Sequence, residues 1–144
     1  MDRVFHAFQL DEDDDITDIG VFTSLSDAEA GIAQYILWDM THEHAFYFLS
    51  GDVELPWGYP TDSEKADLEL DWARVTEWLT SHSPAELISW YRAKQSDLRV
   101  YVIERRFSAL TAVLSQKQVD SIRDDEFRLE NAYLRNGRNL LTDA

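Results

Sequence analysis

The sequence predicts an α+β fold: a small, largely antiparallel sheet of three or four strands packed against two helices, with an additional helical hairpin. Short runs rich in aromatic and β-branched residues open the chain and recur near its middle, and they alternate with segments of helical periodicity. The 144 residues are 44% hydrophobic, so one hydrophobic core can form without disulfides or a structural metal ion. We therefore expect a single domain over residues 1–144, with the 62–95 helical hairpin as a candidate insertion.

The first elements are predicted to form a β-hairpin with an acidic tip. Residues 4–10 and 16–23 are rich in aromatic and β-branched side chains, which favour strands. A polar connection of this length between two such runs indicates a hairpin, although it lacks the glycine that is common in such turns. The tip consists of Asp11, Glu12, Asp13, Asp14 and Asp15.

A helix over residues 25–40 is expected to follow the hairpin. Ser24 or Ser26 can cap its first turn. Apolar residues then recur at helical spacing along one stripe, which would lie on a face of the sheet. This stripe comprises Leu25, Ala28, Ile32, Ile36 and Met40. Leu37 and Trp38 fall outside the stripe, so they form either a second contact or exposed apolar surface.

A third strand and a loop are predicted next. Residues 45–49 are a short aromatic run that ends at a serine and a glycine, which fits a strand better than a continued helix. Residues 51–62 have two prolines and a glycine at their centre, so we expect an irregular loop there.

The second half is predicted to contain three helices and a strand. Capping signatures precede helices over residues 62–80 and 84–95, which we expect to form a helical hairpin. Residues 98–107 include the strongest β segment of the chain and are predicted to form a central strand. Residues 108–114 are ambiguous between a helical turn and a further strand, and a last helix is predicted over residues 116–135.

The net charge of −15 is concentrated in the first half of the chain. Residues 1–64 contain 15 acidic side chains and one basic side chain, Arg3, whereas residues 65–144 contain 13 acidic and 12 basic side chains. A surface with a pI of about 4.4 repels nucleic-acid phosphates and anionic lipid. We therefore expect no direct binding of nucleic acid or membrane and favour a basic protein as the partner.

The sequence gives no indication of export. The first residues lack a basic region followed by an apolar one, and no window approaches the roughly 18 apolar residues of a membrane span. The chain has no cysteine, which excludes disulfides, thiol catalysis and cysteine zinc sites. We expect a cytoplasmic protein without a cofactor.

The acidic tip has part of the spacing of a calcium loop. Asp11, Asp13 and Asp15 match the first three ligand positions of an EF-hand. Ile16 and Phe22, however, occupy the positions that require the turn glycine and the bidentate glutamate. We interpret the tip as a solvated turn.

Other titratable residues do not assemble into a catalytic motif. His42 and His44 flank Glu43 and would face the same side of a strand, but no spacing selects a third metal ligand. Glu104 and Glu126 are interpreted as paired structural charges, because no nucleophile with a base, phosphate loop or paired carboxylate motif accompanies them. We therefore predict that the protein is not an enzyme and holds no metal.

The favoured hypothesis is a non-enzymatic inhibitor that docks its acidic face on a basic, nucleic-acid-binding surface of a partner protein. Acidic residues on neighbouring helical turns lie about 5–6 Å apart, so together they can imitate a row of phosphates. The expected settings are an immunity protein against a nuclease toxin and a phage-type inhibitor of a nucleic-acid-binding defence complex. Besides the five tip residues, the predicted partner-binding residues are Asp18, Asp52, Glu54, Trp57, Tyr59, Asp62, Glu64, Asp67 and Asp71.

Two alternatives remain open at this stage. The acidity can be a solubilising or halophilic coat on a general interaction or regulatory domain, in which case the stability of the protein would rise steeply with molar salt. A metal-dependent enzyme would use His42, Glu43 and His44, and purified protein would then contain bound zinc, manganese or iron.

Overall fold

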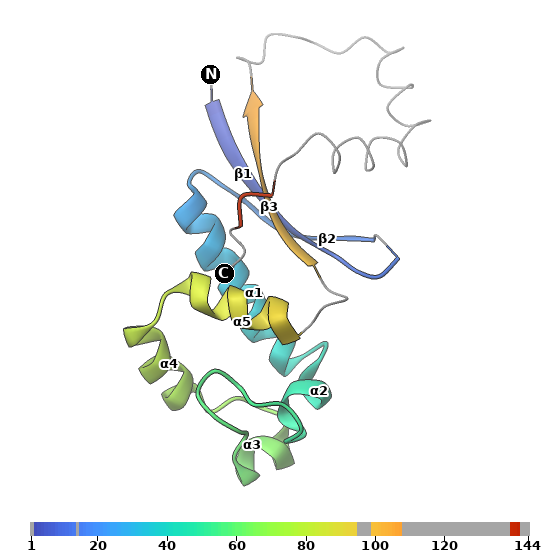
Figure 1. The fold of residues 1–144 in the computed structure, drawn as a ribbon, viewed down its shortest axis with the longest axis vertical. Coiled ribbons are helices and arrows are strands. Elements are labelled where there is room, and N and C mark those ends of the chain that lie inside the picture. The colour runs from blue at the N-terminus through green and yellow to red at the C-terminus, as the bar shows by residue number, and fades with distance from the viewer. Residues whose placement is uncertain (1, 14, 95–98, 108–138, 142–144) are drawn as a thin grey trace.

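The computed structural model describes residues 2–13, 15–94, 99–107 and 139–141 (Figure 1). These residues form a three-stranded antiparallel sheet and several helices, which confirms the predicted α+β class. The sheet occupies one end of the molecule, and most of the helices extend from it toward the other end (Figure 1). Asp14, residues 108–114 and the predicted helix over residues 116–135 lie outside the described residues.

The sheet consists of β1 (Asp2–Leu10), β2 (Ile16–Phe22) and β3 (Arg99–Phe107), in the order β2-β1-β3. Both neighbours of β1 run antiparallel to it, and the register with β2 shifts between Ala7 and Phe8. The three strands match their sequence predictions. Strand β3, which was predicted to be central, lies at an edge of the described sheet. The central strand is β1, which has β2 on one side and β3 on the other.

A short C-terminal segment covers part of the outer edge of β3. The amide side chain of Asn139 acts as a strand neighbour would: its Oδ1 accepts from the Val102 N–H at 3.0 Å, and its Nδ2 donates to the Val100 carbonyl oxygen at 3.2 Å. The N–H of Leu140 donates to the Val102 carbonyl oxygen at 2.8 Å. These bonds satisfy backbone groups that an unpaired edge would expose.

Helix α1 (Leu25–Thr41) packs its apolar stripe on the sheet, as the sequence predicts. It begins at Ser24, whose side chain accepts the Asp27 N–H at 3.0 Å. Four members of the predicted stripe, from Ala28 to Met40, are fully buried. Leu37 is also buried, whereas the Trp38 side chain is 47% exposed, so the two residues outside the stripe have different roles.

Residues 45–49 form the short helix α2 (Ala45–Leu49), so the predicted third strand is wrong. Ala45, Phe48 and Leu49 are buried, while Phe46 and Tyr47 point to solvent. This pattern follows one helical turn and not the alternation of a strand. Packing of Phe48 against Trp90 and Tyr91 therefore overrides the β propensity of the aromatic run.

The predicted helix over residues 62–80 is broken into α3 (Asp62–Asp67) and α4 (Trp72–Ser81). Leu68 ends α3 in the left-handed conformation, with φ 48°, and Leu70 inserts into the core. The single apolar stripe in the sequence concealed this break. The predicted second helix is confirmed as α5 (Pro84–Lys94), which follows α4 after a short turn and packs on α1.

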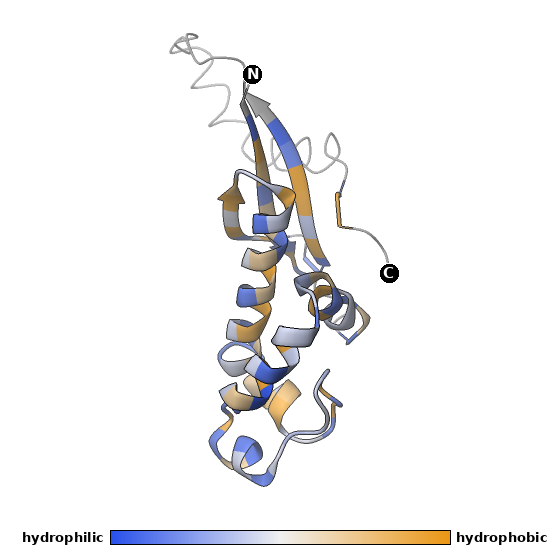
Figure 2. Ribbon diagram, turned by 90° about the vertical axis from the view of Figure 1, so that its left-hand side faces the viewer, coloured by the Kyte–Doolittle hydropathy of each residue, from blue (hydrophilic) through white to orange (hydrophobic). Residues whose placement is uncertain are grey.

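Two clusters of apolar residues stabilise the fold. The larger cluster joins α1, α2, α5 and one sheet face. The smaller cluster, formed by Phe8, Leu10 and Ile103, lies on the opposite sheet face. The end of the molecule that contains α3 is mainly hydrophilic (Figure 2).

Candidate docking surface

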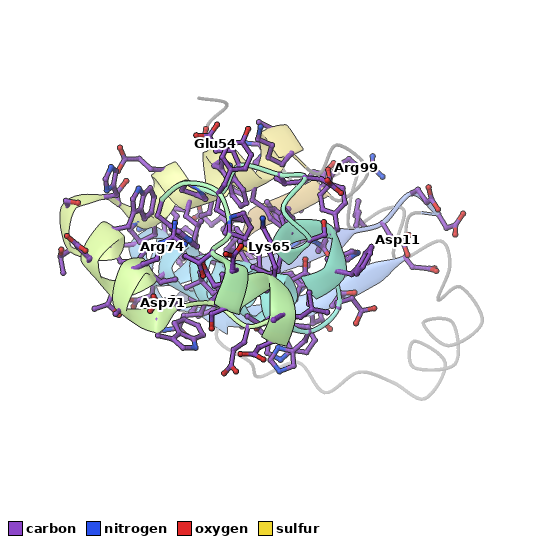
Figure 3. All side chains as sticks on the ribbon, turned by 90° about the horizontal axis from the view of Figure 1, so that it is seen from below. Asp11, Glu54, Lys65, Asp71, Arg74 and Arg99 are labelled. Atoms are coloured by element: carbon purple, nitrogen blue, oxygen red, sulfur yellow. The ribbon has the colours of Figure 1, made fainter. Side chains whose placement is uncertain are left out.

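The predicted partner-binding acids lie in two separate groups. The hairpin-tip group comprises Asp11, Glu12, Asp13 and Asp15 in the β1–β2 turn. The helical-end group comprises Asp52, Glu54, Asp62, Asp67 and Asp71 on α3 and its adjoining segments. Seen from below in Figure 3, Asp11 lies on one side of the molecule and Asp71 on the other, with Lys65 between them. The acids therefore do not form one continuous patch.

Asp11 has a structural role in the hairpin tip. Its Oδ1 accepts the backbone N–H groups of Asp13 and Asp15, both at 2.9 Å. This side-chain cap holds the turn and explains how the hairpin forms without glycine. Arg99 donates to the Asp11 carbonyl oxygen at 3.3 Å, so a base from the second half of the chain adjoins the tip.

The remaining acids of the hairpin differ in their surroundings. Glu12, Asp13 and Asp15 are exposed to solvent. Asp18, on β2, lies 2.7 Å from Nε2 of His6 and is thus paired across the sheet. Glu12, Asp13 and Asp15 therefore present exposed carboxylates at the tip, without an ion-pair partner among the described residues.

Glu64 does not belong to an exposed acidic face, which corrects the sequence interpretation. Its side chain is 2% exposed and completes a capping box with Thr61. One carboxylate oxygen accepts the Thr61 N–H and pairs with Arg74, and the other accepts the Asp71 N–H at 3.0 Å. The carboxylate therefore ties the start of α3 to the start of α4.

The surroundings of Glu64 favour its charged form. Burial by itself would raise the pKa of this carboxyl group, because it removes the charge from water. Hydrogen bonds from the backbone of Asp71 and Thr61, together with the charge of Arg74, outweigh burial and lower the pKa below its usual 4.5. The charge of Glu64 is thus part of the folded structure.

Arg74 also fixes the loop that precedes α3. Its guanidinium group donates to the carbonyl oxygens of Trp57 at 2.9 Å and Tyr59 at 3.3 Å. Trp57 is partly buried and makes an edge contact with Trp78, so its predicted role as an exposed anchor is wrong. Tyr59 is 60% exposed and remains available as a contact residue.

The helical-end group is exposed and keeps its charge uncompensated by ion pairs. All five members are exposed, and none forms an ion pair with another described residue. Asp71 caps α4 by accepting the Ala73 N–H at 3.0 Å, and Asp52 accepts from the Ser50 hydroxyl at 3.3 Å. These hydrogen bonds orient the two carboxylates and leave their charge at the surface.

The two exposed tryptophans of the described residues lie on α1 and α4. Trp38 and Trp72 are 47% and 49% exposed, and the sequence analysis did not select either of them as a contact residue. Trp38 falls outside the predicted stripe and was left open as exposed apolar surface, whereas Trp72 recurs at helical spacing with apolar residues and could not be distinguished from a core residue. The full set of exposed aromatics in the described residues is Trp38, Phe46, Tyr47, Tyr59 and Trp72.

The histidines considered as metal ligands have separate partners. Nδ1 of His42 donates to the Trp38 carbonyl oxygen at 2.9 Å, and the ring stacks on Trp38. Nδ1 of His44 lies 2.6 Å from Oδ1 of Asp39. Both follow α1 in a turn rather than a strand, so the shared strand face expected for them is absent. The described residues hold no group of three or more potential metal ligands.

A buried polar network beneath α1 was not anticipated from the sequence. The Tyr91 hydroxyl donates to Asp39 at 2.8 Å and accepts from the Gln9 amide at 3.0 Å, while Tyr35 donates to the same amide at 2.7 Å. Burial, followed by the charge of Asp39, raises the pKa of Tyr35 to about 12 and also raises the pKa of Tyr91. In the sequence, the one sign of this network is Asp39, an aspartate next to Met40 of the apolar stripe of α1.

A cleft of about 320 Å³ separates the end of α1 from the α3–α4 connection. Leu68, whose left-handed conformation turns the chain, forms part of its wall. The other lining residues are Thr41, His42, Asp67, Glu69 and Trp72. The cleft thus places a histidine, an indole and two acidic residues of the helical end next to one another.

Comparison with protein-family models, curated proteins and solved structures finds no match for this chain. Within the residues that the structure describes, no helix has both the length and the apolar character needed to traverse a bilayer.

Proposed function

We propose that this chain is a non-enzymatic binding protein whose helical end docks on a basic, nucleic-acid-binding surface of a partner protein. The supporting observation is a set of five exposed carboxylates that have no ion-pair partner among the described residues, together with exposed aromatic side chains on α1, α2, α4 and the loop before α3. Exposed charge and exposed tryptophan or tyrosine are the two elements that protein-binding surfaces use for encounter and for anchoring.

The helical end is favoured over the hairpin tip as the main contact. Anchoring residues at interfaces are enriched in Trp and Tyr, and the exposed aromatics of the described residues all belong to α1, α2, α4 and the loop before α3. The tip supplies three exposed carboxylates without such a neighbour in its turn. Its contribution is therefore the long-range attraction that raises the association rate.

The proposed mechanism is exclusion of nucleic acid from the partner. A net charge of −15 attracts a groove that has evolved to bind phosphates. Carboxylates of the helical end would occupy the phosphate positions, and binding of the chain and of nucleic acid would then be mutually exclusive. An immunity protein against a nuclease toxin and a phage-type inhibitor of a defence complex are the settings that fit this mechanism.

The experiment is affinity capture from the native host or its competitor, with two charge-matched variants. D52K/E54K/D62K reverses three acids of the helical end, and E12K/D13K/D15K reverses three acids of the tip. Both spare Asp11 and Asp71, which cap local structure. We expect the first variant to weaken the captured complex by at least about tenfold and the second to act mainly on the association rate.

Salt and nucleic acid provide the controls for this capture. Binding through opposite charges weakens as ionic strength rises, and added nucleic acid should displace the chain from its partner. If the helical-end variant binds as tightly as the unaltered chain, or if nucleic acid and the chain bind the partner together, the proposed function is wrong.

A further inference from the structure

The cleft between α1 and the α3–α4 connection presents hydrogen-bond acceptors. The Thr41 hydroxyl lies 3.1 Å from the Leu37 carbonyl oxygen and 3.0 Å from that of Trp38, so its hydrogen is directed to the helix backbone. Nδ1 of His42 must carry a hydrogen, because the Trp38 carbonyl oxygen at 2.9 Å can only accept.

The charged lining has the same hydrogen-bonding character. Asp67 and Glu69 are both exposed, and a carboxylate has only acceptors. The described residues place no ion-pair partner on either carboxylate. The indole N–H of Trp72 is the one side-chain donor of the lining that is not already engaged. The cleft is therefore complementary to a ligand that is positively charged and rich in donors.

Aromatic rings adjoin these acceptors. Trp72 lines the cleft and is 49% exposed. Trp38, 47% exposed, stacks on His42 with ring centroids 4.9 Å apart and planes inclined by 10°. Tryptophan is the aromatic side chain that attracts a cation most strongly, and a planar guanidinium also stacks on its face.

We infer that this cleft receives an arginine side chain of the basic partner. At about 320 Å³ the cleft is at the lower end of the roughly 300–1,000 Å³ of small-molecule pockets, which suits one side chain better than a large ligand. Arginine combines a planar cation with a fork of five donors, so it satisfies carboxylates and an indole together, whereas lysine is a compact point charge. The inference rests on the proposed function and specifies its anchoring contact.

The test uses the intact chain with an arginine-only peptide and a lysine-only peptide of equal length, so it does not require the partner. We expect the arginine peptide to bind several-fold more tightly. D67N/E69Q should weaken its binding about three- to tenfold. D27N/E77Q removes the same charge from exposed positions outside the cleft lining and outside both acidic groups, and should weaken binding less than about twofold.

The aromatic wall is tested with W72A, and V21A serves as its control because Val21 is an exposed apolar residue of β2, outside the cleft lining and outside the proposed docking surface. W72A should weaken binding of the arginine peptide about two- to fivefold and remove the preference for it over the lysine peptide. V21A should change neither. Backbone NMR spectra of each variant verify that the fold is retained.

The outcomes separate this inference from the proposed function. Equal weakening by the two charge-matched pairs, or equal affinity for the two peptides, would overturn the arginine cleft and leave the acidic docking surface in place. If neither peptide binds the unaltered chain, the arginine cleft and the acidic docking surface are both contradicted.

Discussion

At the scale of single residues, Glu64 shows how a carboxylate predicted for the surface becomes part of the core. The sequence correctly identified its capping box with Thr61. It gave no sign that the chain returns so that the Asp71 N–H and the Arg74 guanidinium meet the same carboxylate, because those contacts depend on the left-handed turn at Leu68. Local capping can be read from spacing, whereas burial depends on the path of the chain.

The stability of the protein should depend on the charge of Glu64. We expect E64Q to lower the free energy of unfolding at neutral pH by about 2–4 kcal/mol, because it removes the negative charge that pairs with Arg74 and replaces one of the two acceptor oxygens by an NH₂ group. E77Q, an exposed glutamate on α4, is the control and should change stability by less than about 0.5 kcal/mol.

The destabilisation caused by E64Q should also depend on pH and should be smaller in acid. The pKa of Glu64 is lower in the folded chain than its usual 4.5, so the unfolded chain takes up the proton first as the pH falls. The stabilisation is complete above pH 4.5 and is lost as the pH falls through the folded pKa. Urea denaturation should show that the difference in free energy of unfolding between wild type and E64Q is smaller near pH 3 than at neutral pH. A difference that grows on acidification contradicts this role of Glu64.

At the scale of secondary structure, periodicity predicted the elements that face a single apolar layer. The strands β1 and β2 and the helices α1 and α5 were predicted because their apolar spacing matches the face that they bury. Helix α2 was mistaken for a strand because five aromatic and aliphatic residues contain too few positions to distinguish the two periods. The break between α3 and α4 was missed because Leu68, Trp72 and Val75 recur at helical spacing across it.

The contact between β2 and α1 provides a test at this scale. The Phe22 ring lies against Gly31 of α1, and a methyl group at that glycine would be only 2.8 Å from Cε1. We expect G31A to destabilise the protein by about 1–3 kcal/mol, although alanine favours a helix. In an F22A background the same change should stabilise by about 0.5–1 kcal/mol. Chemical denaturation of the four proteins of this cycle checks the change of sign, and a stabilising G31A in both backgrounds contradicts the contact.

At the scale of the whole molecule, the sequence predicted an excess of acid but not its arrangement. The predicted partner-binding acids divide between the hairpin tip and the helical end, except that Glu64 is buried and paired with Arg74, and Asp18 lies 2.7 Å from Nε2 of His6. Exposed Trp72 was hidden among apolar residues at helical spacing, whereas exposed Trp38 had been left open as apolar surface. A linear sequence reports the quantity of charge, and the fold decides which charges share a surface with anchoring side chains.

The most direct measurement is backbone amide hydrogen exchange of the chain with and without the captured basic partner. The proposed docking predicts slowed exchange between residues 50 and 72, which contain the acids of the helical end and Trp72. The amides of β2 should exchange as they do in the free chain. Slowed exchange confined to the hairpin, with α3 and the start of α4 unchanged, would contradict the proposal that the helical end meets the partner.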